Sequence, residues 1–549
     1  MLPVATCHNP SGSNKLPYNP DMTDYIIVGG GSAGCVLAAR LSEDPAVNVT
    51  LLEAGPADRS VLIHCPAGLA LLAQTGQANW AFDTVPQAGL NGRIGYQPRG
   101  KVLGGSSSIN AMVYARGHRS DYDYWAALGN PGWSFDEVLP YFKRAEHNER
   151  GADAFHGEGG PLNVMNLRSP NPFGPVFVEA GKQAGFTVNP DFNGAEQEGI
   201  GPYQVTHKNG ERFSAAKAYL TPNRARPNLH IVTGAHTTRI LLEERRAVGV
   251  EYRLDGKLYQ VKANREVLLC AGALQSPQIL MLSGIGPAAQ LMQYGIPVVH
   301  DLAGVGGNFH DHIDTVQVYD APQLKDLFGL SLTGAWHGLK GIFEWRNRRS
   351  GMLTSNFAEA GGFIKSQPVE PIPDLQLHFV IGKLLDHGRK AVFGHGFSCH
   401  VCLLRPQSRG SVALASADPM ASPRIDPNFF SEPDDMVRMI RGFKLMRKIL
   451  TQPALAQYGA KELSRSADAQ SDAAIESFIR NQADTIYHPV GTCRMGNSST
   501  DVVNASLRVH GIECLRVVDA SIIPRIVGGN TNAPVIMIAE KAADMIMRK

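Results

Sequence analysis

The run Asp24-Tyr-Ile-Ile-Val-Gly-Gly-Gly-Ser-Ala-Gly34, with Val49-Thr-Leu-Leu-Glu-Ala54 after it, predicts a strand, a glycine turn, a helix and a second strand that ends in an acid. Gly29 permits the tight turn, Gly31 lets the backbone approach a pyrophosphate, and Gly34 lets the helix pack on the strand. The helix N-terminus offers unpaired N–H groups to phosphates. Glu53, 19 residues after Gly34, stands where a ribose-binding acid belongs. The chain is therefore expected to bind an adenine dinucleotide.

An acid at position 53 favours a ribose with a free 2′-hydroxyl, so it suits FAD or NAD and disfavours NADP. The motif alone does not separate FAD from NAD. A structural strand–helix turn without a ligand is the alternative, because glycine turns are common. The agreement of strand, spacing, helix and acid favours the dinucleotide.

Length and composition limit the classes of protein that remain. A chain of 549 residues exceeds what one core usually holds, so two or more domains are expected. A formal net charge of +2 gives no support to nucleic-acid binding. Eight cysteines in such a length do not form a disulfide framework, and Cys35, Cys270 and Cys514 are expected to be buried thiols.

Two further segments bear on metal binding and location. Cys399-His-Val-Cys402 has CxxC spacing but no second pair of ligands, so no metal is expected there. Residues 1–21 lack the basic start and apolar core of a secretory signal, so we expect a disordered leader, or a start at Met22. No run of about 18 apolar residues predicts a membrane span. Reduced thiols favour the cytoplasm.

The order of predicted elements indicates an interrupted α/β domain. Strands are expected at 229–233, 247–252, 265–270 and 515–519, and helices at 276–283, 433–451 and from about Ala533 onward. Helices are also expected within 118–160, and residues 370–425 are expected to be rich in strands. The sequence therefore predicts a Rossmann-like domain built from distant segments, with a mostly antiparallel sheet domain inserted between them.

Three further segments resemble the glucose–methanol–choline (GMC) flavoprotein oxidoreductases, in family order from about residue 22 to the C-terminus. They are Gly100-Lys-Val-Leu-Gly-Gly-Ser-Ser-Ser-Ile-Asn110, then Ala271-Gly-Ala-Leu-Gln-Ser-Pro-Gln-Ile-Leu-Met-Leu-Ser-Gly-Ile-Gly286, then Tyr487-His-Pro-Val-Gly-Thr-Cys-Arg-Met-Gly496 with Val518–Pro524 and Gly529–Pro534. Asn79–Phe82 and Ile486–Val490 are similar to the choline dehydrogenase-like branch, and within it to membrane-associated aliphatic alcohol dehydrogenases.

The resemblance implies the GMC fold: an α/β FAD-binding Rossmann-like domain and an α+β substrate domain on a mostly antiparallel sheet. It implies FAD-binding segments 22–160, 210–315 and 501–549, and substrate-binding segments 161–209 and 316–500. It also implies oxidation of primary aliphatic or aromatic alcohols to aldehydes, with electrons passed to a quinone-like acceptor. Some relatives tether the flavin through a His where this chain has Ile109, so non-covalent FAD is expected.

The family pattern also implies a set of cofactor-binding residues. Their members are Gly29, Gly31, Ser32, Ala33, Gly34, Glu53, Ala54, Trp80, Arg99, Gly100, Val102, Gly105, Ser106, Asn110, Ala111, Met112, Val113, Thr237, Ala271, Gly272, Tyr487, Asp519, Ala520 and Asn532. Asn532 and the helix start that follows it are expected to face the flavin O2 end, where a helix dipole favours an anion.

His488 and Asn530 are the candidate catalytic residues. Alcohol oxidation needs a base for the hydroxyl proton, and imidazole needs little tuning to accept a proton near pH 7. Family members place a His-His or His-Asn pair over the flavin, which implies Asn530 as the partner of His488. Glu359 is a candidate substrate-binding acid, and a structural hydrogen bond is the equal alternative for it.

Segment 324–345 carries an apolar stripe, Leu332, Trp336, Leu339 and Phe343, followed by basic residues. Such a stripe is ordinarily core packing, and a helix that lies on a membrane surface is the alternative. It would place a cytoplasmic protein on the inner face of the cytoplasmic membrane. The competing functions are choline dehydrogenase, an oxygen-using oxidase, a lyase that keeps FAD, and a non-enzymatic flavin protein.

Overall fold

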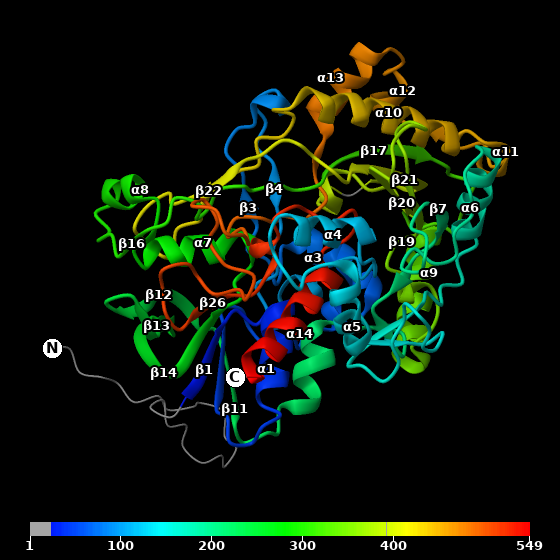
Figure 1. Cartoon of the computed structure of the whole chain (residues 1–549). Coiled ribbons are helices and arrows are strands. Elements are labelled where there is room, and N and C mark those ends of the chain that lie inside the picture. The colour runs from blue at the N-terminus through cyan, green and yellow to red at the C-terminus, as the bar shows by residue number, and fades with distance from the viewer. Residues whose placement is uncertain (1–22, 391, 549) are drawn as a thin grey trace.

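The strand–turn–helix unit forms the centre of one sheet in the computed structural model, which describes residues 23–390 and 392–548 (Figure 1). The sheet has the order β11-β2-β1-β14-β13-β12, with β26 also paired to β14. Its strands are β1 (Thr23–Val28), β2 (Val49–Glu53), β11 (Leu229–Thr233), β12 (His236–Glu243), β13 (Arg246–Leu254), β14 (Lys257–Leu269) and β26 (Leu515–Val517). The expected leader, residues 1–21, lies outside the described residues.

The parallel pairs in this sheet join segments that are distant in sequence. β1 pairs in parallel with both β2 and β14, and β26 pairs in parallel with β14. The side chains of β2 are all buried, as expected for a strand covered on both faces. The predicted interrupted domain is therefore present: its sheet takes strands from the beginning, the middle and the end of the chain.

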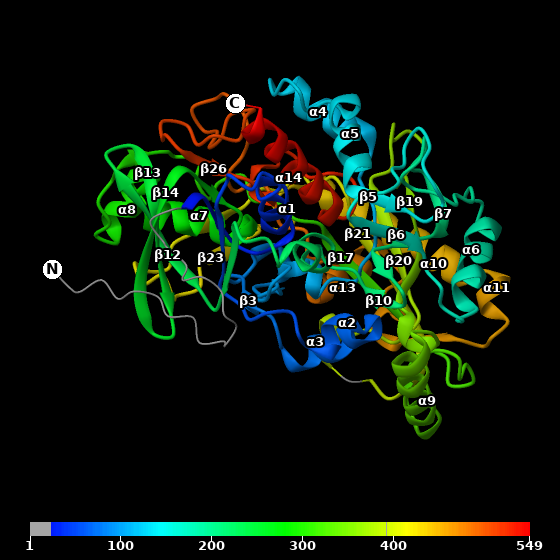
Figure 2. The same cartoon turned by 90° about the horizontal axis from the view of Figure 1, so that it is seen from below.

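Two helices from opposite ends of the chain pack on each other against this sheet. They are α1 (Ser32–Leu41) and α14 (Asn532–Met547), which lie side by side as the blue and red helices in Figures 1 and 2. Arg40 donates to the buried carboxylate of Glu540 at 2.9 Å, an ion pair that joins the two helices. The C-terminal segment is thereby held beside the glycine turn.

The second sheet is built from antiparallel pairs, as the fold class predicted. Its main path is β24-β17-β21-β20-β19-β7, with β18 and β25 paired at its sides. The five longer members are β7 (Gly199–Pro202), β17 (Ile313–Asp320), β19 (Ala358–Ile364), β20 (Leu375–Val380) and β21 (Gly394–Leu403). Helices α6 (Phe173–Gln183) and α10 (Pro433–Leu450) pack on it, and Phe177 of α6 stacks on Phe379 of β20 at 4.7 Å.

Helix α7 (Gly272–Leu282) begins four residues before the predicted start at Ser276. Asp519 explains the earlier start, because its carboxylate accepts hydrogen bonds from the Gly272 N–H at 2.8 Å and from the Ser276 hydroxyl. The predicted strand 515–519 ends at Val517, and this leaves Asp519 free to act in this way. The predicted helix at 433–451 matches α10 within one residue.

The remaining elements are short or connect the two sheets. The helices are α2 (Val61–His64), α3 (Leu69–Thr75), α4 (Arg119–Ala127), α5 (Phe135–Ala145), α8 (Ala288–Gln293), α9 (Leu332–Arg348), α11 (Pro453–Ala456), α12 (Ser464–Ala467) and α13 (Asp472–Gln482). The strands are β3 (Phe82–Asp83), β4 (Tyr96–Gln97), β5 (Glu146–Asn148), β6 (Leu162–Asn166), β8 (Gln204–Val205), β9 (His207–Lys208), β10 (Glu211–Arg212), β15 (Ile285–Gly286), β16 (His300–Asp301), β18 (Gly329–Leu330), β22 (Ser411–Ala413), β23 (Arg424–Asp426), β24 (Lys461–Glu462) and β25 (Asp484–Thr485).

Core packing is the wrong interpretation of the apolar stripe on α9. Its four side chains are between 64% and 94% exposed, and Figure 2 shows α9 extending beyond the rest of the described chain. The helix is anchored instead by Gly341 and Trp345 on another face. Among the described residues, no helix combines the length and apolarity needed to cross a bilayer.

Of the three cysteines predicted to be buried, Cys35 and Cys270 are buried and Cys514 is not. All described cysteines are free thiols, and Cys514 is partly exposed because it lies in a turn beside β26 and not within the strand. Cys399 and Cys402 are buried in β21, and no group of metal-ligating side chains occurs among the residues that the structure describes.

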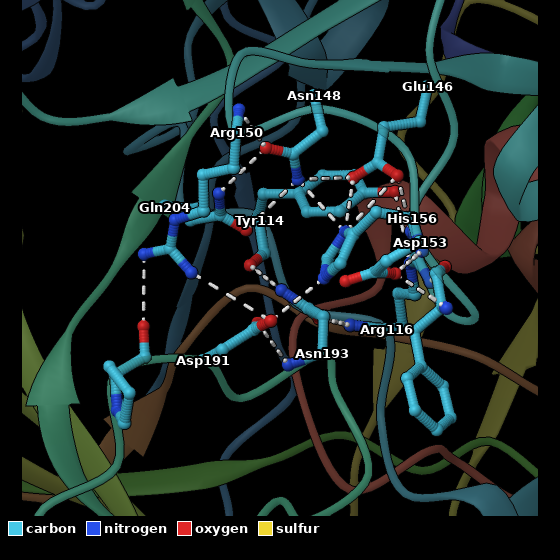
Figure 3. Close-up of polar contacts among 12 residues, drawn as sticks. Tyr114, Arg116, Glu146, Asn148, Arg150, Asp153, His156, Asp191, Asn193 and Gln204 are labelled. Atoms are coloured by element: carbon cyan, nitrogen blue, oxygen red, sulfur yellow. Dashed lines mark hydrogen bonds and ion pairs between the residues drawn. The ribbon is translucent and has the colours of Figure 1, made fainter.

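A buried charge network joins Arg116, Glu146 at the start of β5, His156 and Asp191 (Figure 3). Arg116 pairs with Glu146 at 2.7 Å, and His156 lies 3.2 Å from Glu146 and 2.8 Å from Asp191. Burial lowers the pKa of His156, but the two carboxylates outweigh it and raise the pKa to about 9. His156 is therefore an imidazolium at neutral pH, held between two acids.

This network predicts a loss of stability in alkali. The folded-state pKa of His156 lies above its unfolded value, so protonated His156 stabilises the fold by up to about 3 kcal/mol. This contribution to the free energy of unfolding is complete below about pH 6.5 and is lost as pH rises through about 9. Urea unfolding at pH 7 and pH 9.5 should show this fall in the free energy of unfolding. His156→Asn should flatten it, whereas His337→Asn on exposed α9 should not. An equal fall in the free energy of unfolding between the two pH values in all three proteins would contradict the assignment of the effect to His156.

Candidate active site

One cavity of about 620 Å³ connects the glycine turn to the candidate catalytic pair. Gly29 and Gly31 line it at one place, and His488 and Asn530 line it at another. Side chains from both sheets contribute to its wall, including His378 of β20 and Thr237 of β12. A ligand long enough to fill the cavity would therefore contact the dinucleotide turn and the catalytic candidates at once.

The turn has the geometry that the motif requires. Gly29 has φ +101°, a conformation open mainly to glycine, and a Cβ there would lie 2.5 Å from the Cys270 carbonyl oxygen. A Cβ on Gly34 would lie 1.9 Å from the Gly29 carbonyl oxygen, so this position needs glycine for helix packing. Gly31 lies on the cavity, and a Cβ there would meet nothing within 4 Å, so its backbone faces open space.

Glu53 lies on the cavity wall at the end of β2. Its carboxylate accepts hydrogen bonds from the Gly30 N–H at 2.8 Å and from the Gly55 N–H at 2.7 Å. Burial raises the pKa of this acid to about 7, against the lowering effect of these N–H groups. The acid keeps further acceptor lone pairs for a ribose hydroxyl.

Almost all of the predicted cofactor-binding residues line this cavity. They are Gly29, Gly31, Ser32, Ala33, Glu53, Ala54, Trp80, Arg99, Gly100, Gly105, Ser106, Asn110, Ala111, Met112, Val113, Thr237, Ala271, Gly272, Tyr487, Asp519, Ala520 and Asn532. Gly34 and Val102 are not among the lining residues. Gly34 serves helix packing, and Val102 packs in an apolar cluster with Ile63 and Leu72.

The residues present fit FAD. Backbone N–H groups at the start of α1 suit a pyrophosphate, Glu53 suits a ribose, and the N-terminus of α14 lies on the cavity where it favours negative charge. Asn532 at that helix start accepts a hydrogen bond from the Ser32 hydroxyl at 2.7 Å, so its side chain oxygen is directed to the turn. Ile109 lies on the cavity and has no nucleophilic atom.

The predicted catalytic pair is brought together. Asn530 Nδ2 lies 3.2 Å from His488 Nε2, although 42 residues separate the two. The His488 backbone N–H donates to the buried carboxylate of Asp311 at 2.8 Å. Tyr487 has φ +78°, and its carbonyl oxygen accepts a hydrogen bond from Arg99 at 2.8 Å. These contacts fix the backbone that carries the imidazole into the cavity.

Sequence reasoning missed three residues that contact this pair. His312 Nδ1 lies 3.0 Å from His488 Nδ1, Gln376 Nε2 donates to Asn530 Oδ1 at 3.1 Å, and Asp311 holds the His488 backbone. The run Phe309-His-Asp-His-Ile-Asp314 contained a usable signal for Asp311 and His312, because it places titratable residues just before a buried strand. Gln376 gave no such signal, since it reaches the site only through the pairing of β20.

The expectation that His488 needs little tuning is wrong. Its side chain is buried, and desolvation, with His312, His378 and Arg99 nearby, lowers its pKa well below the ordinary value. The same cause lowers the pKa of His312 to about 3. Both rings are therefore neutral at neutral pH, and the burial that keeps His488 neutral also disfavours the imidazolium that forms when the ring takes a proton.

Glu359 is not on the cavity, in contrast to the candidate role as a substrate-binding acid. Its carboxylate accepts a hydrogen bond from the Ser355 hydroxyl at 2.7 Å, and burial raises its pKa. The residue before it, Ala358, lines the cavity, whereas Glu359 lies where the pairing of β19 with β20 shifts register. Three carboxylates line the cavity: Glu53 and Asp519 belong to the predicted cofactor-binding set, and the third, Asp314, pairs with His400 at 2.6 Å.

Comparison with known proteins agrees with this site. The N- and C-terminal profiles of the GMC oxidoreductases match residues 23–314 and 406–539. The chain is 50% identical to an alcohol dehydrogenase [acceptor] of Pseudomonas putida, over 96% of each chain, and 45% identical to the mitochondrial choline dehydrogenase of Homo sapiens, over 96% of this chain and 90% of that one.

Solved structures share the fold over nearly the whole chain. Pyridoxine 4-oxidase from Mesorbium loti has a TM-score of 0.86 at 33% identity, covering 96% of this chain and 99% of its own. A variant of Aspergillus oryzae formate oxidase has a TM-score of 0.88 at 28% identity, covering 96% of this chain and 98% of its own. The profile matches and the near-complete relatives show that the chain belongs to the GMC oxidoreductase family, as an FAD-dependent oxidoreductase.

Proposed function

We propose that this protein oxidises primary aliphatic or aromatic alcohols to aldehydes with FAD and passes the electrons to a quinone-like acceptor. The observation that carries the proposal is the single cavity that joins the dinucleotide turn to His488 and Asn530. The 50% identity to an alcohol dehydrogenase [acceptor] supports the reaction class. Choline oxidation and an oxygen-using oxidase are the alternatives that the experiments below separate.

His488 and Asn530 divide the work on the alcohol oxygen. Neutral His488 accepts the hydroxyl proton at Nε2, and the Asn530 amide donates a hydrogen bond to the oxygen as negative charge develops. FAD, when bound, supplies the hydride acceptor at N5. The two side chains come from different segments, so correct placement depends on the packing of the C-terminal segment against residues 310–314.

The cofactor is held without a covalent bond in this proposal, because Ile109 replaces the tethering residue of some relatives. Segments 22–160, 210–315 and 501–549 hold FAD, and segments 161–209 and 316–500 form the substrate side. The first sheet draws its strands from the former set, and the second sheet draws nearly all of its strands from the latter, with β17 starting at Ile313.

His488→Ala should lower the rate of flavin reduction by alcohol by roughly 10² to 10⁴, the range for a lost general base. FAD should stay bound, since the ring is remote from the glycine turn in sequence and its side-chain hydrogen bonds are to Asn530 and His312. Stopped-flow flavin absorbance under anaerobic conditions measures the rate, with His337→Ala as the control. A reduction rate close to wild type would remove His488 from the mechanism.

The charge of the cavity favours neutral alcohols over choline. Glu359 is absent from the wall, and Asp314, the cavity carboxylate outside the predicted cofactor-binding set, has one oxygen paired with His400. Phe328, Phe357 and Val380 contribute apolar surface to the same cavity. Two observations favour choline instead: the similarity to choline dehydrogenases at 43–45% identity, and the presence of Asp314 on the cavity wall.

Straight-chain and benzylic primary alcohols should therefore have kcat/KM at least about tenfold above that of choline, because binding a quaternary ammonium would need an acid not already paired. Steady-state assays with a soluble quinone acceptor across the panel measure this. Asp314→Asn should change the choline value more than the aliphatic values if choline binds there at all. A choline kcat/KM above that of every neutral alcohol would make the protein a choline dehydrogenase.

The apolar stripe of α9 supports a contact with an anionic membrane surface. Leu332, Trp336, Leu339 and Phe343 are exposed together, and Lys340 lies on the same helix. Leu330 and the highly exposed Phe393 lie at the base of this helix, where β18 pairs with β21. We name these six apolar side chains the α9 patch.

The α9 patch borders the cavity. Gly329 and Leu330 line the cavity, as do Val392 and Gly394 on either side of Phe393, and Lys390 adds a positive charge there. Apolar side chains with basic neighbours suit the boundary between headgroups and acyl chains of an anionic bilayer. Docking by this patch would turn the cavity mouth toward the phase that holds lipophilic alcohols and quinones.

A variant with Leu332, Trp336, Leu339 and Phe343 all changed to Gln should bind phosphatidylglycerol vesicles at least about tenfold more weakly, because four large apolar side chains no longer leave water. Vesicle sedimentation measures the partition. Leu258→Gln with Met292→Gln, two exposed apolar positions elsewhere, is the matched control and should bind as wild type. Equal partition of all three proteins would remove the docking proposal.

The same variants test the acceptor. Oxidation of the reduced protein by a water-soluble quinone should be unchanged in the α9 variant, whereas turnover with a long-chain quinone in vesicles should fall. Rapid, saturating peroxide production in air by the wild-type protein would instead identify an oxidase.

A further inference from the structure

We propose that His312 and Gln376 are positioning residues that keep Nε2 of His488 as a hydrogen-bond acceptor, the state in which it can take the alcohol proton. The inference rests on the proposed role of His488 and adds how the protein sets the protonated nitrogen of its ring. It follows from two hydrogen-bond chains that end at His488 from opposite sides.

The first chain begins at a backbone carbonyl. The Leu404 oxygen can only accept, and His312 Nε2 lies 3.1 Å from it, so this nitrogen carries the hydrogen. A neutral imidazole has one N–H, so His312 Nδ1 is an acceptor. It lies 3.0 Å from His488 Nδ1, which must therefore donate. The single N–H of neutral His488 is used in this bond, and its Nε2 is left with a lone pair.

The second chain begins at another backbone carbonyl. The Leu377 oxygen accepts the hydroxyl hydrogen of Tyr203 at 2.6 Å, so the Tyr203 oxygen must accept from Gln376 Nε2 at 3.2 Å. Gln376 Nε2 uses its other hydrogen on Asn530 Oδ1 at 3.1 Å. This orients the Asn530 amide with Nδ2 toward His488 Nε2, so Asn530 donates and His488 accepts.

Both chains assign the same role to the same atom. Tyr203, Gln376 and His312 are almost completely buried, so water does not offer them alternative partners. A flipped Asn530 amide would set its NH₂ against that of Gln376, and a His488 ring with hydrogen on Nε2 would set an N–H against that of Asn530. Each alternative leaves buried donors facing each other, which is unfavourable because neither donor then has an acceptor.

The charged and titratable groups around His488 keep its ring neutral before the alcohol proton is taken. His312, His378 and Arg99 lie close enough to disfavour a positive charge on its ring, and Asp311 is bound to the His488 backbone N–H. When His488 takes the alcohol proton at Nε2, its Nδ1–H bond to His312 Nδ1 becomes charge-assisted and strengthens. The single lone pair of Nε2 passes from the Asn530 N–H to the alcohol proton in this step, so that N–H is released to donate to the alcohol oxygen, and the ring returns to neutral when the proton leaves.

The test compares His312→Asn with His312→Leu. The Asn side chain oxygen can occupy the place of His312 Nδ1 and accept from His488 Nδ1–H, whereas Leu offers no acceptor. His312→Leu should slow anaerobic flavin reduction by about 10 to 100-fold, the range for the loss of a residue that orients an active-site ligand, and His312→Asn should recover most of the rate. FAD content and thermal midpoint show whether each variant is folded.

Gln376→Glu supplies a readout that a purely structural role would not move. A carboxylate only accepts, so Asn530 should turn its NH₂ toward the introduced carboxylate and present Oδ1 to His488 Nε2, which favours a hydrogen on that nitrogen. The pH profile of flavin reduction should shift to higher pH, and the ¹⁵N chemical shift of His488 Nε2 should move toward a protonated nitrogen. Gln376→Met should lower the rate without this shift.

The outcomes separate this inference from the proposed function. Equal rates for His312→Leu and His312→Asn, or an unshifted Gln376→Glu profile in folded, FAD-loaded protein, would overturn the positioning role while His488→Ala still abolished most activity. A His488→Ala protein that reduces its flavin normally would overturn the proposed function itself.

Discussion

The packing of helix α14 on helix α1 is the constraint on which the site depends. It joins residues 500 apart in sequence, through the Ser32–Asn532 hydrogen bond and the Arg40–Glu540 ion pair. Because Asn530 stands two residues before α14, this packing sets the distance between the catalytic amide and the glycine turn. Loss of the α1–α14 contact would separate the two ends of the cavity, even with every catalytic side chain intact.

The second sheet and the residues next to it supply the side chains that hold the catalytic pair. Asp311 and His312 precede β17, Gln376 lies in β20, and these residues hold His488 and Asn530 from the side opposite the dinucleotide turn. The cavity therefore lies between a sheet suited to phosphates and a sheet that carries buried, directional hydrogen bonds. Desolvation by this sheet keeps the imidazole neutral, which is the form a base requires.

Much of the fold and of the candidate site can be predicted from the sequence, and the physical reason differs from residue to residue. The turn at Gly29–Gly34 and the acid at Glu53 follow from steric and hydrogen-bond rules that act within about thirty residues. The family resemblance identified His488 and Asn530. For Glu359 the sequence left a substrate contact and a structural hydrogen bond as equal alternatives, because residue type does not say which face of a strand a side chain takes. The apolar stripe of α9 was misjudged because periodicity does not say whether a partner covers it. Gln376 was missed because only sheet pairing brings it to Asn530.

The cavity is expected to position an alcohol so that it loses its hydroxyl proton to His488 and a hydride to FAD. Anaerobic mixing of the FAD-loaded protein with a straight-chain primary alcohol, bearing hydrogen or deuterium on the carbinol carbon, tests this most directly. The oxidised flavin absorbance should be lost, more slowly with deuterium, and one aldehyde should form per flavin. Persistence of the oxidised flavin spectrum with every primary alcohol and with choline would contradict it.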